Sequence, residues 1–224
     1  MTTSDEQFYL PLMKKMVDVL AHDVRNPLNN ILLSTAQFKM ETLPDKDDSV
    51  FYIDIIERNC DRVNQLLSEL LEALHPPLLS IQEWDIEEVL KDSIADFEDR
   101  FSLKNIKYRF ETNGASVLPF DRANLKIAFR NIIQNAVDAM PNGGELTIEI
   151  VEQADEIVVI ISDTGLGINQ DILPQIFAPF FSTKERRKGL GLCQAKNITN
   201  AHNGKIAANS EPNKGTVVQL FLNK

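Results

Sequence analysis

Cysteine, histidine and tryptophan are scarce in this chain of 224 residues, which holds two cysteines, three histidines and one tryptophan. Cys60 and Cys193 lie far apart in the sequence. This spacing fits neither a disulfide framework nor a cysteine-rich metal site, and it suits a reducing compartment. Because histidines are so few, the sequence context of each one is informative.

Basic residues and long apolar runs are also in short supply. Lysine and arginine number 23 against 33 acidic residues, a formal net charge of -10. This balance argues against non-specific binding to nucleic acid or to an anionic membrane surface. The longest purely apolar run, Ile157–Ile161, is far too short to span a membrane. Since the segment from Met1 to Gln7 is polar and acidic, we expect no signal peptide, no membrane segment in this chain and a cytoplasmic location.

Apolar residues recur at helical spacing from about Phe8 to Leu74 and predict two long helices. The second carries a heptad seam made of Ile53, Ile56, Cys60, Val63, Leu67, Leu70 and Leu74. Between the helices, the polar and proline-containing segment Leu43–Asp48 predicts a connection. A hairpin cannot cover apolar stripes on both of its arms, so we expect a homodimer whose hairpins form a four-helix bundle. The alternative is a hairpin packed on its own C-terminal domain.

A domain boundary is predicted at His75–Pro77, because proline cannot continue a helix. We therefore expect a helical domain at 1–78 and a second domain at 79–224. In the second domain, the expected helices cover 85–101, 121–140 and 190–202, and the expected strands cover 106–110, 145–151, 156–162, 205–208 and 216–222. This order predicts an α+β protein, with an α/β sandwich whose helices lie on one face of a mixed sheet.

The first expected helix contains the sequence His22-Asp23-Val24-Arg25-Asn26-Pro27-Leu28. Neutral imidazole is nucleophilic near neutral pH when its second ring nitrogen is held as a donor. Asp23 can orient the ring, and Asn26, one turn later, can place a water in line with a phosphorylated His22. Pro27 removes a helical hydrogen bond to the Asp23 carbonyl, so we expect the helix to bend or loosen there. A histidine on a solvated, charged helix surface is the alternative.

Two motifs that suit a nucleotide pocket follow about a hundred residues later. Asn131 and Asn135 are four residues apart on an expected helix and project from one face, where carboxamides can serve Mg²⁺ and phosphate. A polar junction between helices is the alternative for this pair. Asp163, Gly165 and Gly167 form a turn at a strand end, where the carboxylate can accept a hydrogen bond from an adenine amino group and glycine allows close approach.

A second glycine turn and a lid complete the pattern. Gly189-Leu190-Gly191-Leu192 opens a helix, and amide groups at a helix start bind phosphate. Before it, the aromatic stretch Phe177–Phe181 leads into the basic stretch Ser182–Lys188, which fits a lid whose cation reaches a γ-phosphate. Ordinary core aromatics and a solvated basic loop are the alternatives. All these motifs in one order make coincidence improbable.

Together these motifs resemble the H, N, G1, F and G2 boxes of the bacterial sensor histidine kinases, over roughly Phe8–Leu222. The resemblance implies a Bergerat-type ATP-binding fold, which is also seen in DNA gyrase and in heat-shock chaperone ATPases. It further implies that the chain uses ATP and Mg²⁺ to phosphorylate its own histidine. The phosphoryl group would then pass to an aspartate on the receiver domain of a response regulator.

The resemblance also assigns roles to residues. His22 would be phosphorylated, Asp23 would act as its base, and Asn26 would serve phosphatase activity toward the regulator. Asn135 would hold Mg²⁺, Asp163 would bind adenine with Thr216 acting through water, and Lys184 would reach the γ-phosphate. The nucleotide-binding set would be Asn131, Asn135, Ala139, Asp163, Gly165, Gly167, Ile168, Lys184, Gly189, Leu190, Gly191, Leu192 and Thr216.

One residue departs from the family pattern. Arg187 stands where the first glycine of a GxGxG turn is usual, and we expect it to stiffen the lid and slow ATP turnover. Two alternative functions stay open, and the Arg187 departure is the reason to keep the first of them. One is a nucleotide-binding signalling scaffold, or a phosphatase acting through Asn26, with little kinase activity. The other is an ATPase of the gyrase or chaperone kind, against which the helical hairpin and His22 argue.

Overall fold

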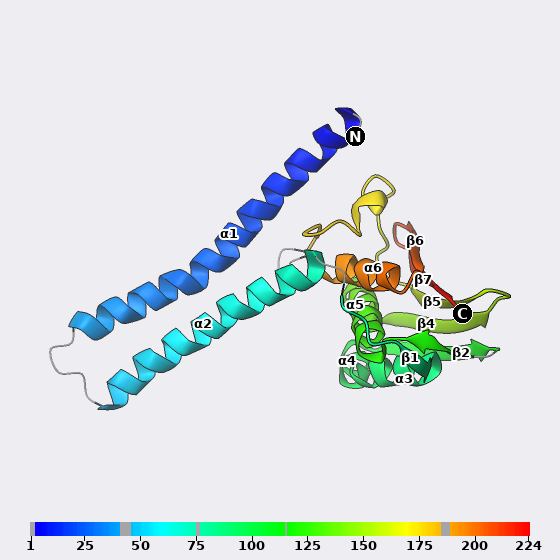
Figure 1. The fold of residues 1–224 in the computed structure, drawn as a ribbon, viewed down its shortest axis with the longest axis horizontal. Coiled ribbons are helices and arrows are strands. Elements are labelled where there is room, and N and C mark those ends of the chain that lie inside the picture. The colour runs from blue at the N-terminus through cyan, green and yellow to red at the C-terminus, as the bar shows by residue number, and fades with distance from the viewer. Residues whose placement is uncertain (1–2, 41–45, 75–76, 115, 185–188) are drawn as a thin grey trace. The chain divides into compact units, whose positions relative to one another are not determined.

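The computed structural model describes residues 3–40, 46–74, 77–114, 116–184 and 189–224 (Figure 1). The chain divides into two compact units, Met1–Glu72 and Ala73–Lys224. Across the described ranges, no helix combines the length and the apolar character that crossing a membrane requires.

The first unit is a helical hairpin, as the sequence predicts. Helix α1 spans Thr3–Met40 and helix α2 spans Lys46–Leu74. A polar link joins the two helices, because Asn30 Nδ2 donates to Asn59 Oδ1 at 3.2 Å while Asn59 Nδ2 donates to the Ile55 carbonyl at 2.7 Å. Helix α1 continues through Pro27, so the proline does not end it.

The second unit is built on a mixed sheet, which confirms the predicted class. Its strands lie in the order β2 (Ile106–Asn113), β4 (Gly144–Glu152), β5 (Glu156–Asp163), β7 (Gly215–Asn223) and β6 (Lys205–Glu211). The β2–β4 pair is parallel and the other pairs are antiparallel. A separate small sheet pairs β1 (Gln82–Asp85) with β3 (Val117–Phe120).

Helices cover one face of the large sheet (Figure 1). They are α3 (Ile86–Ala95), α4 (Glu98–Lys104), α5 (Arg122–Ala139) and α6 (Gly191–Ala201), with a short 3₁₀ turn, η1, at Leu173–Gln175. Every second residue of the central strands belongs to the core that these helices complete: Leu146, Ile148, Ile150, Ile157, Val159, Ile161, Val218, Leu220 and Leu222. The alternation follows from the two-residue period of a strand.

The structure differs from the expected elements of this unit in several places. The helix expected at 85–101 is two helices, because it breaks at Asp96 and Phe97. Phe97 and Phe101 are both buried, so the apolar residues keep the spacing of a single helix across the break. The sequence pattern therefore gives no sign of the break. Strand β2 runs on to Asn113 and strand β6 runs on to Glu211, so both are three residues longer than expected. The sequence did not predict β1 or β3. Asp85 caps α3 as expected, since its Oδ1 accepts from the Glu87 N–H at 2.9 Å.

Candidate functional site

The predicted phosphoryl acceptor, His22, lies within α1, and its side chain lies outside the described part of the structure. Asp23 is half-buried, Asn26 is exposed and Pro27 is buried. Because α1 is helical from His22 to Asn26, the two residues lie one turn apart on one face, as the sequence predicts.

In the second unit, α5 is anchored where it begins. Asp121 caps the helix through Oδ1, which accepts from the Asn124 N–H at 2.9 Å, while its Oδ2 accepts from the Ser80 N–H at 2.7 Å. Burial favours the neutral acid, but these hydrogen bonds outweigh it and lower the pKa of the Asp121 carboxyl. The Asp121 N–H donates to Nε2 of His202 at 3.0 Å, so this histidine ties the end of α6 to the start of α5.

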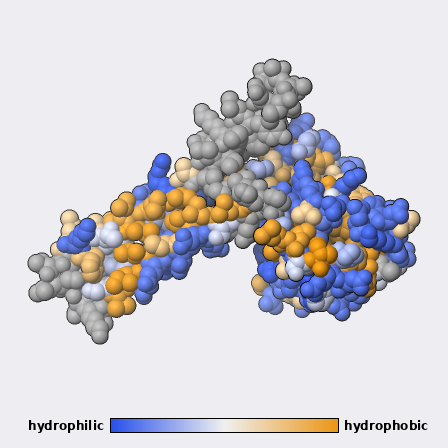
Figure 2. Space-filling model, in the orientation of Figure 1, coloured by the Kyte–Doolittle hydropathy of each residue, from blue (hydrophilic) through white to orange (hydrophobic). Residues whose placement is uncertain are grey.

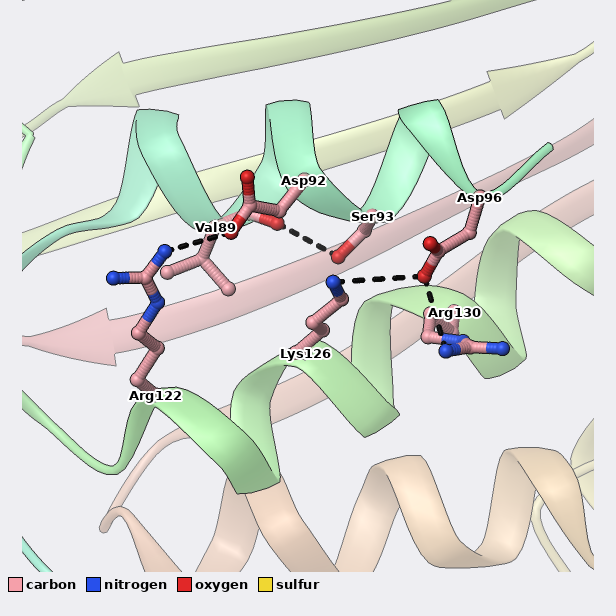
Figure 3. A network of polar contacts seen from close by, with 7 residues as sticks. All are labelled: Val89, Asp92, Ser93, Asp96, Arg122, Lys126 and Arg130. Carbon is pink, nitrogen blue, oxygen red and sulfur yellow. Dashed lines mark hydrogen bonds and ion pairs between the residues drawn. The ribbon is translucent and has the colours of Figure 1, made fainter. Parts of the chain in front are cut away.

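A strip of polar residues on α5 faces α3, where Figure 3 shows its first three members, and continues to α4. Its members recur at every fourth position: Arg122, Lys126, Arg130, Gln134 and Asp138. Arg122 Nη2 lies 2.6 Å from Asp92 Oδ2. Asp96 Oδ2 lies 3.0 Å from Arg130 Nη1 and 3.6 Å from Lys126 Nζ. Toward the C-terminal end of α5 the basic residue lies on the partner helix instead, because Arg100 of α4 contacts Gln134 and Asp138. The strip fixes the rotation of α5 about its axis.

On the neighbouring face of α5, Asn131 meets the second glycine turn. Its Nδ2 donates to Gln194 Oε1 at 2.9 Å, which joins α5 to α6. A Cβ on Gly191 would lie 3.2 Å from Asn131 Oδ1, so a side chain at this position would make the asparagine shift by a few tenths of an ångström. Asn131 thus holds a junction between two helices.

Asn135 differs from Asn131 although both belong to the same motif. Among the described residues, the structure gives the half-buried Asn135 carboxamide no hydrogen-bond partner. A partly buried amide without a protein partner is free to meet a ligand. The two interpretations of the asparagine pair therefore apply to different residues. Asn131 forms the polar junction between helices, whereas the carboxamide of Asn135 is available to a ligand.

One turn further along the same face, Ala139 meets the first glycine turn. The Leu166 N–H donates to the Ala139 carbonyl at 3.0 Å, and a Cβ on Gly165 would lie only 2.5 Å from that oxygen. Gly167 has φ +64°, and a Cβ there would lie 2.0 Å from the Glu211 carbonyl oxygen, so this turn requires glycine. Both glycine turns therefore pack on one face of α5, with Asn135 between them, over about 12 Å of helix.

Asp163 supplies the carboxylate of this site. It lies directly opposite Thr216 in the β5–β7 pair, and its Oδ1 accepts from the Gly165 N–H at 2.8 Å. Burial raises the pKa of the Asp163 carboxyl, against the opposing effect of the N–H groups of Gly165 and Thr216 and the positive charge of Lys184. Lys184 is exposed and lies close enough to Asp163 to act on it electrostatically.

The remaining predicted site residues lie around the same turns. The Ile168 N–H donates to Ser210 Oγ at 2.8 Å. Gly189 has φ +70° and packs on the aromatic stretch, since a Cβ there would lie 2.4 Å from the Phe181 carbonyl oxygen. Leu190 is the residue before α6, and Leu192 packs against the core. Arg187 lies outside the described residues.

Known protein families match the two units separately. The His Kinase A (phospho-acceptor) domain matches residues 12–73, and the histidine kinase-, DNA gyrase B-, and HSP90-like ATPase matches residues 120–224. Sporulation kinase C of Bacillus subtilis (strain 168) is 34% identical over 215 residues, which cover 95% of this chain and 49% of the relative. The sensor histidine kinase ZraS of Salmonella typhi is 31% identical over 205 residues, 91% of this chain and 44% of the relative.

This chain belongs to the bacterial sensor histidine kinases. A solved structure agrees: histidine kinase ThkA in complex with response regulator protein TrrA matches with a TM-score of 0.67 and 27% identity, over 98% of this chain and 64% of that one. The chain spans about half the length of the curated relatives named above. The fold predicted from the resemblance, a helical region followed by an ATPase-type α/β domain, is confirmed.

Two polar residues of this sensor histidine kinase could not be predicted from its sequence. Gln194 holds Asn131, and Ser210 contacts the first glycine turn. Neither belongs to a motif that is typical of a ligand site, and a single serine in a strand gives no periodic signal. Only the β6–β7 pairing, which sets Ser210 opposite Thr216, brings it to the pocket.

Proposed function

We propose that this protein phosphorylates itself on His22 with ATP and then donates the phosphoryl group to an aspartate of a response regulator. The observation that carries the proposal is the face of α5 that meets both glycine turns. On it, the open carboxamide of Asn135 lies between the turns that pack on Asn131 and Ala139. Asp163 and Thr216, beside the first turn, would bind adenine, and Lys184 would reach the γ-phosphate.

In the first step, a ring nitrogen of His22 attacks the γ-phosphorus of ATP. The bond between that phosphorus and the bridging oxygen of ADP breaks, and ADP leaves with the electron pair. Asp23 accepts the proton from the other ring nitrogen as the phosphoramidate forms. Transfer to the regulator then exchanges this phosphorus–nitrogen bond for an acyl phosphate. The ThkA structure, solved with a response regulator protein, supports the choice of partner.

Magnesium is implied by the family, and the residues present fit it. Among the described residues, no three His, Cys, Asp or Glu side chains gather into a metal site. Mg²⁺ in phosphate sites takes one or two protein oxygens together with phosphates and waters. The Asn135 carboxamide oxygen would hold the ion without adding negative charge. When bound, the ion neutralises charge on the β- and γ-phosphates.

We also propose a homodimer formed by the hairpin. Figure 2 shows hydrophobic side chains gathered along α1 and α2. The large apolar residues exposed on these helices include Leu28, Leu32, Leu33, Val50, Phe51, Ile53, Leu67 and Leu71. Leucine and isoleucine stripes of this extent are normally covered, and a second hairpin would complete a four-helix bundle.

Incubation with γ-labelled ATP and Mg²⁺ tests the proposal, comparing wild type with His22→Gln and Asn135→Ala. We expect acid-labile label on wild type alone. Asn135→Ala should fold with wild-type stability, within about 0.5 kcal/mol, because the carboxamide has no protein partner to lose among the described residues. The matched control is Asn200→Ala, an exposed asparagine of α6, which should label normally.

Label that persists on His22→Gln would contradict the assigned acceptor. If wild type binds ADP in calorimetry but takes no label, the kinase proposal fails in favour of a scaffold or a phosphatase acting through Asn26. Turnover of ATP without any phosphoprotein would instead favour the ATPase alternative.

A further inference from the structure

Ser210 is a buried hydroxyl in β6, 7% exposed, that contacts both sides of the adenine end of the proposed site. Its Oγ accepts from the Ile168 N–H at 2.8 Å. The same Oγ lies 2.7 Å from the Gly215 carbonyl oxygen and 2.9 Å from Thr216 Oγ1. These contacts join the first glycine turn to the start of β7.

The direction of these hydrogen bonds follows from counting protons. A serine hydroxyl has one proton and two lone pairs. The Gly215 carbonyl has no proton, so Ser210 must donate its own to that oxygen. Ser210 Oγ therefore accepts from Ile168 and also from Thr216, which makes the Thr216 hydroxyl the donor in their contact. With its proton used there, Thr216 has only lone pairs left for a ligand.

Asp163 lies directly opposite Thr216 in the sheet, so their side chains share one face of the β5–β7 pair. An ionised carboxylate is also an acceptor only. The ligand therefore meets two acceptors side by side. A purine with an amino group at position 6 supplies the matching donors. A purine with a keto oxygen at this position would instead place a third acceptor against Asp163 and Thr216, where no hydrogen bond can form.

We propose that Ser210 is a positioning residue that makes the base pocket select amino purines over keto purines, by fixing the direction of the Thr216 hydroxyl. The proposal rests on the proposed function, because it takes Asp163 and Thr216 as the groups that face the base. Ser210 itself acts through Thr216 and through the amide of Ile168. Free of Ser210, the Thr216 hydroxyl could turn and donate to a keto oxygen.

The test is the ratio of the dissociation constants of IDP and ADP, measured by calorimetry on the full chain. Ser210→Ala should lower this ratio about three- to tenfold, the size of one hydrogen bond. Thr216→Val should lower it similarly, and the double variant should fall no further than either single one. Thr216→Ser should keep the wild-type ratio. The matched control is Ser93→Ala, since Ser93 is a fully buried serine whose hydroxyl donates to the Val89 carbonyl of its own helix (Figure 3).

A purely structural role for Ser210 predicts a different result. In that case Ser210→Ala would weaken ADP and IDP by the same factor and leave the ratio unchanged, which would overturn the proposal. If Ser210→Ala fails to fold, Ser210→Cys takes its place, because a thiol of similar size is a weak hydrogen-bonding group, and the same fall is expected. Wild type that binds neither nucleotide would count against the proposed function itself.

Discussion

At the scale of single residues, burial decides the chemistry of Asp163. Its carboxyl accepts hydrogen bonds from backbone N–H groups, yet burial outweighs them and raises its pKa above the ordinary value of 3.8. The folded protein therefore holds a proton on this group more tightly than the unfolded chain does. Ionised Asp163 costs stability at neutral pH, and this cost disappears below pH 3.8.

Asp163→Asn removes this cost together with the charge that would receive the base in the proposed site. We expect ADP to bind about 10- to 100-fold more weakly, since a hydrogen bond to a charged group is lost. The stability test uses protein without nucleotide and compares the free energy of unfolding of the variant with that of wild type. The variant should gain stability relative to wild type as the pH rises from 3.8 through the raised pKa of Asp163. Urea titrations at several pH values measure this difference.

Asp155→Asn is the control for that experiment, because Asp155 is an exposed carboxylate in the β4–β5 turn. It should bind ADP normally and show no comparable trend. A difference for Asp163→Asn that stays flat with pH, or decreases, would contradict the conclusion that burial raises the pKa of the Asp163 carboxyl.

At the scale of elements, the polar strip between α5 and α3 fixes the helix that carries the candidate site (Figure 3). Asp96 contacts both Lys126 and Arg130, whereas Asp92 forms its ion pair with Arg122. All these side chains are partly exposed, so water weakens each pair. We expect Asp96→Ala to lower the free energy of unfolding by about 0.5–1 kcal/mol, and Asp92→Ala by less.

Chemical denaturation with urea at low and high NaCl checks this prediction, because salt screens exposed pairs. The loss for Asp96→Ala should shrink at high salt, while Glu83→Ala, an exposed control on β1, should change little at either. Equal losses for Asp92→Ala and Asp96→Ala, or a loss insensitive to salt, would show that the strip does not act through charge.

The elements that the sequence predicted well are those with strong local signals. Long helical periodicity predicted α1 and α2, and the cap at Asp121 predicted the start of α5. By contrast, β1 and β3 are four residues each and pair across α3, α4 and β2, so no local pattern marks them. The glycine turns could be predicted as motifs. The contacts of Gln194 and Ser210 could not, because they depend on which strands and helices become neighbours.

At the scale of the whole molecule, the proposed homodimer would form through the apolar surface of the hairpin. Leu67 on α2 is 46% exposed and Leu71 is 56% exposed. Burying a leucine side chain contributes about 1.5–3 kcal/mol, and a symmetric dimer buries each position twice. Leu67→Glu should therefore raise the dimer dissociation constant by at least about a hundredfold, as measured by sedimentation equilibrium.

Gln65→Glu is the matched control, because it adds the same charge to an exposed position of α2 that lies two residues away and so points to a different face. It should leave the dimer intact. A Leu67→Glu protein that remains dimeric would move the interface away from this seam. If Leu67→Glu becomes monomeric, its labelling with γ-labelled ATP shows whether the reaction stays within one protomer. Label retained at wild-type level means that each protomer phosphorylates its own His22. Label lost while ADP still binds means that one protomer phosphorylates His22 of the other.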